Sequence, residues 1–252
     1  MKNKTILTKT ALLVAGILAG FLIGRISFPA EIVPSQTQET QPAAITAAQQ
    51  TPIQPETYLK PKIFETISGV SADDDPYLGP ADARLTIIEF SDYQCLYCKK
   101  YFTETFAMLK KDYIDTGKVK YVVRDFPVSE HPQALLAAEA ADCAASQNKF
   151  WEMHGLLFAA QDNWSYSQDA TKTFKEFARQ LNLDGNKFSS CLDNGDYEQE
   201  IAKDVTDGEL YKIAFTPTIF VGDKKIVGAQ PYEVFRKVID SELNKLWQTQ
   251  EM

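Results

Sequence analysis

Apolar and polar positions between residues 85 and 124 follow two strand patterns on either side of a helical one. Residues 85–90 form a short apolar run, typical of a strand buried in the centre of a sheet. Over residues 96–113, apolar side chains recur along one helical stripe. Residues 118–124 alternate and are rich in β-branched side chains, which indicates a second strand. The stretch predicts a strand–helix–strand unit with a crossover long enough for parallel strands.

Downstream of residue 132 the pattern becomes helical, and strand patterns return only near the C-terminus. We expect helices over residues 134–145, 150–158, 171–181, 186–192 and 197–211, strands over 218–221 and 225–227, and a last helix over 231–246. Gly222-Asp223 suits a tight hairpin turn between the two late strands. The order β-α-β, helical insertion, β-β-α predicts an α/β domain interrupted by an all-α lobe at about residues 131–211.

The first 28 residues have the pattern of a membrane-targeting segment. Three lysines precede an uncharged, apolar run at residues 10–24, and Arg25 follows it. The positive-inside rule places the N-terminus in the cytoplasm and the rest of the chain outside. No small-x-small cleavage site follows, so we interpret residues 1–28 as a retained transmembrane signal anchor. A cleaved signal peptide is the alternative, and in either case the bulk of the chain is exported.

Residues 29–57 contain five prolines among Gln, Thr and Ala, without Lys or Arg. This stretch has neither strand nor helix periodicity, and too little bulky apolar surface to offset the entropy of ordering. We interpret it as a disordered stalk between the membrane and a folded domain at residues 58–248.

Composition and charge narrow the classes of function. A net charge of −8 without a long basic block argues against nucleic-acid binding. Four cysteines are too few for a disulfide-dense mini-protein, and 44% apolar residues suffice for an ordinary core. The two histidines, His131 and His154, are interpreted as structural, and we expect neither metal nor cofactor. Three successive acids at residues 73–75 are read as a solvated acidic loop in preference to a cation site.

Cys95 and Cys98 stand at the junction between the first strand and its helix. Free backbone N–H groups and the helix dipole favour a thiolate at a helix N-terminus. The second cysteine lies on the same helix face, within reach of a disulfide. Half a zinc site and an inert disulfide are the alternatives, but a zinc ribbon needs a second close pair, and Cys143 and Cys191 are far apart. In an exported chain we expect Cys143 and Cys191 to form a structural disulfide, with two buried free thiols as the alternative.

Five short stretches, in this order, resemble a known family. They are residues 78–83 (LGPADA), 89–95 (EFSDYQC), 149–154 (KFWEMH), 216–218 (TPT) and 228–232 (GAQPY). Over residues 73–246 the chain resembles the exported thiol–disulfide oxidoreductases of the DsbA or BdbD type. The resemblance implies a thioredoxin fold (β-α-β, β-β-α) with an inserted all-α lobe.

The same resemblance assigns roles to site residues. Cys95 is expected to be the exposed sulfur that attacks or is attacked, and Cys98 the deeper partner that leaves or resolves. The resemblance implies a cis Thr216–Pro217 bond facing the cysteines, with the Thr216 backbone able to pair with an extended substrate. It also implies a proton relay from Glu89 to Cys98, whereas a solvated edge position for Glu89 is the alternative.

Aromatic residues near the cysteines are candidates for an apolar substrate patch. We assign Tyr97 to substrate binding, while Phe90 and Tyr93 suit either the patch or the core. Phe215 stands where the family often has glycine, which is expected to reshape the substrate groove and not the chemistry. The Leu96-Tyr97 pair between the cysteines tunes the redox potential, and family oxidases often have proline in place of the leucine.

The sequence therefore predicts an exported, membrane-tethered oxidase of protein thiols. Its substrates would be unfolded or reduced exported proteins, and family resemblance implies a quinone-linked membrane reoxidase of the DsbB or vitamin-K-epoxide-reductase (VKOR) type. A reductase or isomerase on the same scaffold is one alternative, although residues 29–57 do not suit the dimerisation domain that isomerases usually carry. A redox-inactive binding or chaperone module in the cell envelope is the other.

Overall fold

The computed structural model of the protein describes residues 63–248. The expected signal anchor (1–28) and stalk (29–57) lie outside the described residues. None of the helices between residues 63 and 248 combines the length and the apolar character that crossing a bilayer requires.

The described residues form one mixed sheet in the strand order β1-β6-β5-β3-β4-β2. The strands are β1 (Ile63–Thr66), β2 (Tyr77–Leu78), β3 (Leu85–Ser91), β4 (Val119–Asp125), β5 (Thr218–Val221) and β6 (Lys224–Val227). The central strands β3 and β4 run parallel, with Glu89 opposite Val123, and the other pairings are antiparallel. The crossover expected from the sequence thus connects the two central strands.

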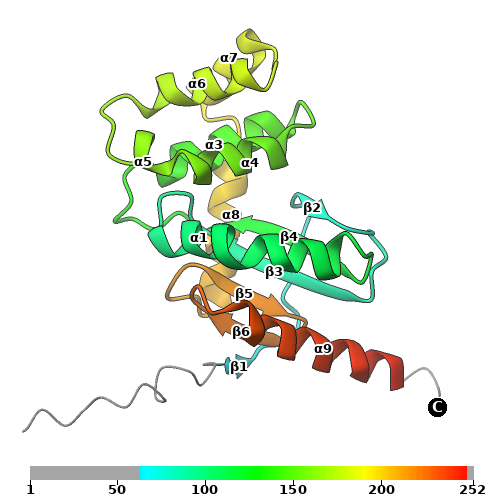
Figure 1. Ribbon diagram of the computed structural model, residues 1–252. Coiled ribbons are helices and arrows are strands. Elements are labelled where there is room, and N and C mark those ends of the chain that lie inside the picture. Colours follow the sequence, from blue (N-terminus) through cyan, green and yellow to red (C-terminus); the bar gives the residue numbers. More distant parts are fainter. Residues whose placement is uncertain (1–62, 249–252) are drawn as a thin grey trace, which may run out of the picture. The chain divides into compact units, whose positions relative to one another are not determined.

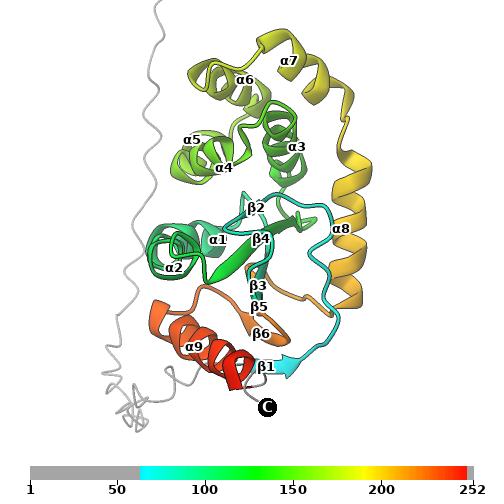
Figure 2. The same cartoon turned by 90° about the vertical axis from the view of Figure 1, so that its right-hand side faces the viewer.

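Helices cover both faces of this sheet and form a separate lobe (Figure 1). A continuous helix follows β3 and consists of α1 (Leu96–Tyr101), the π-helical η2 (Phe102–Phe106), α2 (Ala107–Leu109) and the π-helical η3 (Lys110–Ile114). The remaining helices are α3 (Ala134–Ala145), α4 (Phe150–Ala159), α5 (Gln161–Trp164), α6 (Ala170–Gln180), α7 (Gly185–Asn194), α8 (Glu198–Leu210) and α9 (Tyr232–Gln248). Figure 2 shows α1, α2 and α9 on one face of the sheet and α8 on the other, while α3 to α7 make up the lobe.

Strand alternation divides the core into two layers. Ile88 and Phe90 point to the α8 face, where they join one buried cluster with Phe126. Ile87 and Tyr121 point to the opposite face and join the larger cluster beneath α1 and α9. Glu89 has the same parity as Ile87, so its side chain enters the layer under the helix that carries the cysteines.

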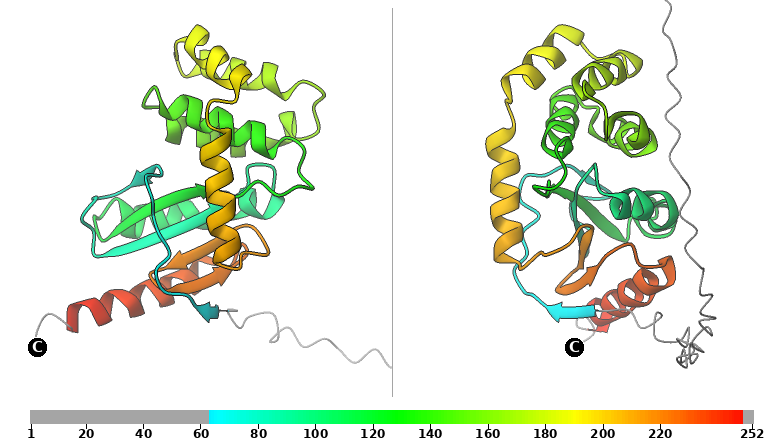
Figure 3. Two further views of the ribbon diagram at one scale, coloured as in Figure 1. Left: turned by 180° about the vertical axis from the view of Figure 1, so that it is seen from behind. Right: turned by 90° about the vertical axis from the view of Figure 1, so that its left-hand side faces the viewer.

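The elements predicted from the sequence are all present, with ends displaced by two residues at most. The expected insertion at about residues 131–211 corresponds to α3 through α8, and Figure 3 shows α8 returning from this lobe to the sheet. Three short elements were not predicted: the edge strands β1 and β2 and the single-turn helix α5. The fold class is as expected, a thioredoxin-type α/β domain with an inserted helical lobe.

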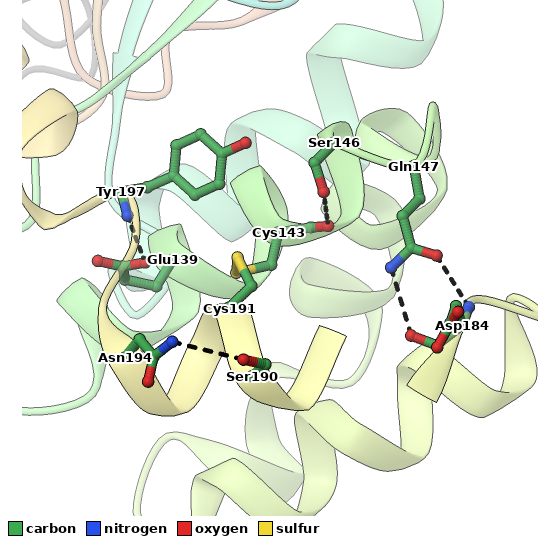
Figure 4. The surroundings of a disulfide bond; sticks show 9 residues. All are labelled: Glu139, Cys143, Ser146, Gln147, Asp184, Ser190, Cys191, Asn194 and Tyr197. Atoms are coloured by element: carbon green, nitrogen blue, oxygen red, sulfur yellow. Dashed lines mark hydrogen bonds between the residues drawn. A yellow bond between two sulfur atoms is a disulfide. The ribbon is translucent and has the colours of Figure 1, made fainter. Parts of the chain in front are cut away.

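A disulfide between Cys143 and Cys191 joins α3 to α7 within the lobe (Figure 4). Both sulfurs are buried. Close by, the Gln147 side chain exchanges two hydrogen bonds with the backbone of Asp184. The Tyr197 backbone N–H donates to Glu139, which links the start of α8 to α3.

Arg124, near the end of β4, forms ion pairs with α8. Its guanidinium is fully buried and pairs with Asp204 and Asp207 of α8, and also with Asp75, 3.0 Å away. The prediction of a solvated acidic loop at residues 73–75 is therefore wrong for Asp75, whose side chain is only 9% exposed. The sequence pattern around Asp75 does not show that its carboxylate pairs with the buried guanidinium of Arg124.

The backbone of α8 also passes close to the Phe126 side chain, which follows β4. A Cβ atom at Gly208 would lie 2.5 Å from the Phe126 ring, so only glycine fits where α8 passes the end of β4.

Candidate active site

Cys95 is the N-cap residue of α1, and Cys98 lies one turn further along. Both thiols are reduced in this structure. Cys98 is completely buried, and Cys95 is only 7% exposed. The expected order of depth is therefore found, but the description of Cys95 as an exposed sulfur is wrong, because a loop from a distant part of the chain covers it.

The covering loop contains the Thr216–Pro217 peptide bond, which is cis. The Cys95 thiol donates to the carbonyl oxygen of Thr216 at 3.5 Å. Thr216 itself is 8% exposed. The structure thus brings together Cys95, Thr216 and Pro217, three of the residues assigned from the sequence.

The two thiols differ in acidity. A hydrogen bond from the Cys98 thiol, together with the backbone N–H groups of Tyr97 and Cys98, lowers the pKa of Cys95 to about 6. Burial and the neighbouring Cys95 sulfur raise the pKa of Cys98 well above its ordinary value. At neutral pH the reduced pair therefore consists of a Cys95 thiolate and a Cys98 thiol.

Glu89 is buried beneath this pair, with 2% of its surface exposed. The alternative of a solvated edge position is therefore excluded. Burial raises the pKa of Glu89 to about 7, against the opposing effect of hydrogen bonds from Tyr121 and Ser91. A carboxyl group with this pKa can both accept and release a proton near neutral pH.

Asp92 organises the loop that leads into α1, a role that the sequence did not reveal. One carboxylate oxygen accepts the backbone N–H groups of Gln94 at 2.7 Å and Cys95 at 3.1 Å. The other accepts the Val128 N–H and lies 2.8 Å from Nδ1 of His131. The Asp92 backbone N–H in turn points to the Cys98 sulfur at 3.4 Å.

Glutamine side chains hold the active-site loop against the helical lobe. Gln161 of α5 is buried and donates to the carbonyl oxygens of Tyr93 at 2.7 Å and Cys95 at 3.1 Å. Gln94 donates to the Ser165 carbonyl and accepts the Gln133 N–H, both at 2.7 Å. These partners lie at least 39 residues apart in the chain, so no local sequence motif predicts the hydrogen bonds between them.

His154 has the structural role expected from the sequence. It is buried among aromatic rings, including Phe102 and Phe158, and burial lowers its pKa to about 3. Nδ1 of the neutral imidazole lies 3.0 Å from the Tyr93 hydroxyl oxygen. The aromatic cluster therefore connects α4 to the active-site loop.

Apolar side chains are exposed on both sides of Cys95. Leu96 and Tyr97 are 62% and 64% exposed, and Phe215, next to the cis peptide, is 68% exposed. Phe90 and Tyr93 are buried and belong to the core. Tyr97 and Phe215 are therefore the aromatic neighbours that remain available to a substrate.

Between residues 63 and 248, one group of acidic side chains brings its oxygens close enough together for a cation: Asp73, Asp74 and Glu200. Lys203 lies within 3.7 Å of a carboxylate oxygen of each, so its ammonium group already offsets part of their negative charge. The cysteine pair is not part of such a group.

Comparisons with known proteins agree with this geometry. A family described as Thioredoxin matches residues 71–241. Disulfide bond formation protein D of Bacillus subtilis is 28% identical over 71% of this chain and 82% of its own length. The crystal structure of oxidised BdbD from the same organism superimposes with a TM-score of 0.65 at 29% identity, covering 71% of this chain and 99% of the other.

Two further similar proteins are a DsbA and a part of a much longer antiporter. Wolbachia pipientis α-DsbA1 has a TM-score of 0.64 at 25% identity, covering 71% of this chain and 95% of its own. The Na⁺/H⁺ antiporter NhaA 3 of Salinispora tropica is 35% identical over 68% of this chain, which spans only 25% of the antiporter's length. The match to the family over residues 71–241, together with these neighbours, shows that the chain belongs to the thioredoxin family, as a member of the DsbA-like type.

Proposed function

We propose that this chain is an exported, membrane-tethered protein thiol–disulfide oxidoreductase that oxidises substrate dithiols through a Cys95–Cys98 disulfide. The observation that carries the proposal is the opposed acidity of the two thiols, with a pKa of about 6 for Cys95 and a raised pKa for the buried Cys98. Its relatives named disulfide bond formation protein D and BdbD support the same chemistry.

Oxidation of a substrate begins at Cys95, the more accessible sulfur of the disulfide. A substrate thiolate attacks the Cys95 sulfur, the Cys95–Cys98 bond breaks, and Cys98 leaves as a thiolate. Because burial disfavours this thiolate, it takes a proton, and the protonated carboxyl group of Glu89 is the buried donor. The mixed disulfide between Cys95 and the substrate remains.

The second step releases the product. Another thiolate of the substrate attacks the substrate sulfur of the mixed disulfide, and Cys95 leaves as a thiolate. Two electrons have then passed from the substrate dithiol to the enzyme. The low pKa of Cys95 makes it a good leaving group here, which favours the oxidising direction.

A substrate strand has a place beside the cis peptide. The Thr216 carbonyl oxygen lies 3.5 Å from the Cys95 sulfur, so the backbone of this loop faces the reacting atom. An extended segment that carries a reactive cysteine would pair with this backbone, and its apolar side chains would contact Tyr97 and Phe215.

The redox potential tests the direction of electron flow. The full-length protein is equilibrated with glutathione buffers, and the reduced fraction is measured by alkylation. An oxidase should have a potential of about −120 mV, and a value of about −270 mV would instead make the protein a reductase.

Cysteine variants test whether exchange is the function at all. Cys98→Ser should accumulate mixed disulfides between Cys95 and substrate proteins, because the resolving thiol is absent. Cys95→Ser is the matched control and should accumulate none. Full biological function in the Cys95→Ser variant would leave only a redox-inactive binding or chaperone role.

The role of Glu89 has its own test. Glu89→Gln should slow the exchange reaction without abolishing it, because Cys98 can still leave as an unprotonated thiolate, at a higher cost in free energy. Stopped-flow fluorescence or quenched alkylation gives the rate. An unchanged rate would remove Glu89 from the mechanism.

The tether and the partner rest on the sequence. Lysines and an apolar run within residues 1–28 support an anchor with the catalytic domain outside the cytoplasm. Reoxidation needs an acceptor for two electrons, and a quinone-linked membrane protein of the DsbB or VKOR type suits the resemblance. Membrane fractionation and protease digestion of spheroplasts test the location, and a soluble or cytoplasmic chain would contradict it.

A further inference from the structure

The buried hydroxyl groups of Tyr101 and Tyr121 form a hydrogen-bonded chain that ends at Glu89. The Tyr121 hydroxyl donates to one carboxylate oxygen of Glu89, and the Ser91 hydroxyl donates to the other at 2.8 Å. The hydroxyl oxygens of Tyr121 and Tyr101 lie 3.2 Å apart. Tyr101 belongs to α1, the helix that carries both cysteines, whereas Tyr121 comes from β4.

Proton counting fixes the direction of this chain when Glu89 is ionised. A tyrosine hydroxyl has one proton to donate. Because the Tyr121 proton is directed at Glu89, the proton between the two tyrosines comes from Tyr101. The order is then Tyr101 to Tyr121 to Glu89, and every donor points towards the carboxylate. A hydroxyl that itself accepts a hydrogen bond becomes a stronger donor.

The surroundings of Glu89 leave these hydroxyls as its main source of stabilisation. Tyr121 and Tyr101 are 0% and 1% exposed, so water does not replace them. Within residues 63–248, Glu89 forms no ion pair with a lysine or arginine. The titratable groups whose charges interact with Glu89 are Cys95, Cys98, Tyr93, Tyr101 and Tyr121, and each gains negative charge on ionisation.

We propose that Tyr121, supported by Tyr101, is a positioning residue that favours the ionised form of the buried Glu89, so that Glu89 is ready to take the proton of Cys98. This inference rests on the proposed function and deepens it. In the step concerned, Cys95 is bound to a partner through a mixed disulfide. Glu89 accepts the Cys98 proton, the Cys98 thiolate attacks the Cys95 sulfur, the Cys95–partner bond breaks, and the partner leaves as a thiolate.

The hydroxyl chain matters most in this half of the cycle. When substrate is oxidised, Cys98 leaves as a thiolate and needs a protonated Glu89. When the enzyme is reoxidised, Cys98 must lose its proton, and Glu89 must be ionised. A pKa of about 7 serves both halves, and removing a donor hydrogen bond would disturb the second half selectively.

The experiment uses full-length protein with glutathione attached to Cys95, and the release of glutathione by Cys98 is followed against pH. Loss of a hydrogen bond to an ion raises the pKa of the acceptor by about one pH unit or more. In Tyr121→Phe the pKa of Glu89 should therefore rise to about 8 or higher, and release at pH 7 should slow about fivefold. Attack of glutathione on the oxidised protein should not slow.

Tyr113→Phe is the matched control. Tyr113 is a buried tyrosine near the end of the long helix that carries the cysteines, and its hydroxyl, like that of Tyr121, donates to a carboxylate, that of Asp240, at 2.7 Å. Its removal should reproduce any general loss of stability but leave the pH midpoint of glutathione release unchanged. An equal midpoint in Tyr121→Phe and the unmodified protein would overturn the proposal.

A second measurement needs no variant. In the unmodified reduced protein, carbon NMR follows the Glu89 carboxyl and the Tyr121 ring carbon that bears the hydroxyl. Both signals should titrate with one midpoint, and an unresponsive Tyr121 would also reject the coupling. If Cys95 formed no mixed disulfide with glutathione, the proposed function would fail, yet the NMR titration would still decide the role of Tyr121.

Discussion

The low pKa of Cys95 makes the stability of the reduced protein depend on pH. Folding moves this thiol from an ordinary pKa of 9.0 to about 6, chiefly through the hydrogen bond from Cys98. A group whose pKa is lowered by folding stabilises the folded state fully above its unfolded pKa. That stabilisation declines as pH falls from about 9 and is gone below about 6.

The size of the pKa shift of Cys95 determines how much the thiolate stabilises the folded, reduced protein. Three pH units correspond to about 4 kcal/mol of stabilisation at high pH, at about 1.4 kcal/mol per unit. At pH 7 the unfolded thiol is mostly protonated, so only about 1.4 kcal/mol remains. The disulfide form has no thiolate and lacks this contribution. The same energy therefore favours the reduced form over the disulfide and raises the redox potential by about 30 mV at pH 7.

The assay compares reduced and oxidised protein. Urea unfolding at a series of pH values gives the free energy of unfolding of each form, and groups that titrate alike in both forms cancel in the difference. The advantage of the reduced form should grow with pH between about 6 and 9. The rate of alkylation by iodoacetamide should independently show a midpoint near 6.

A midpoint near that of an ordinary thiol would refute this reasoning. So would a stability difference that does not change with pH. Cys98→Ala removes the donor with the largest effect on Cys95, and in this variant the alkylation midpoint should move upwards.

Two further predictions concern stability. Arg124→Met should lower the free energy of unfolding in urea by about 3–5 kcal/mol, because it leaves buried carboxylates without their cation. Lys203→Met removes an exposed cation that contacts the same acidic loop and should cost far less, so equal losses would contradict this account. Replacing Cys143 and Cys191 by alanine should cost about 4 kcal/mol, since their disulfide closes a loop with a sequence separation of 48. Non-reducing peptide mapping checks the bridge, and two free thiols would reject it.

Periodicity predicted the framework of the site because that framework is local. The strand before Cys95, the helix after it and the parallel strand that follows each have a complete pattern within a short window. The edge strand β2 and the helix α5 have 2 and 4 residues, too few to show a period. Their positions depend on partners in distant parts of the chain.

The burial of Cys95 could not be predicted from its own neighbourhood. A strand-to-helix junction is open when considered alone, but the Thr216 carbonyl comes within 3.5 Å from 121 residues further along the chain. The residues around Tyr121 likewise do not distinguish it from an ordinary aromatic residue of a strand. Only the register of β3 and β4 shows that its hydroxyl reaches Glu89.

The asymmetry of the two thiols explains why a buried acid belongs in this site. An oxidised enzyme needs one sulfur that leaves easily towards substrate, and the stabilised Cys95 thiolate provides it. The other sulfur must stay inaccessible, or a second substrate would attack it, and complete burial of Cys98 ensures this. The same burial makes its thiolate unstable, so every opening and closing of the disulfide has to move a proton in a place without water. A carboxyl group with a pKa of about 7 on the adjacent strand is the minimal solution, and the hydroxyl groups around Glu89 are what keep its pKa from rising further.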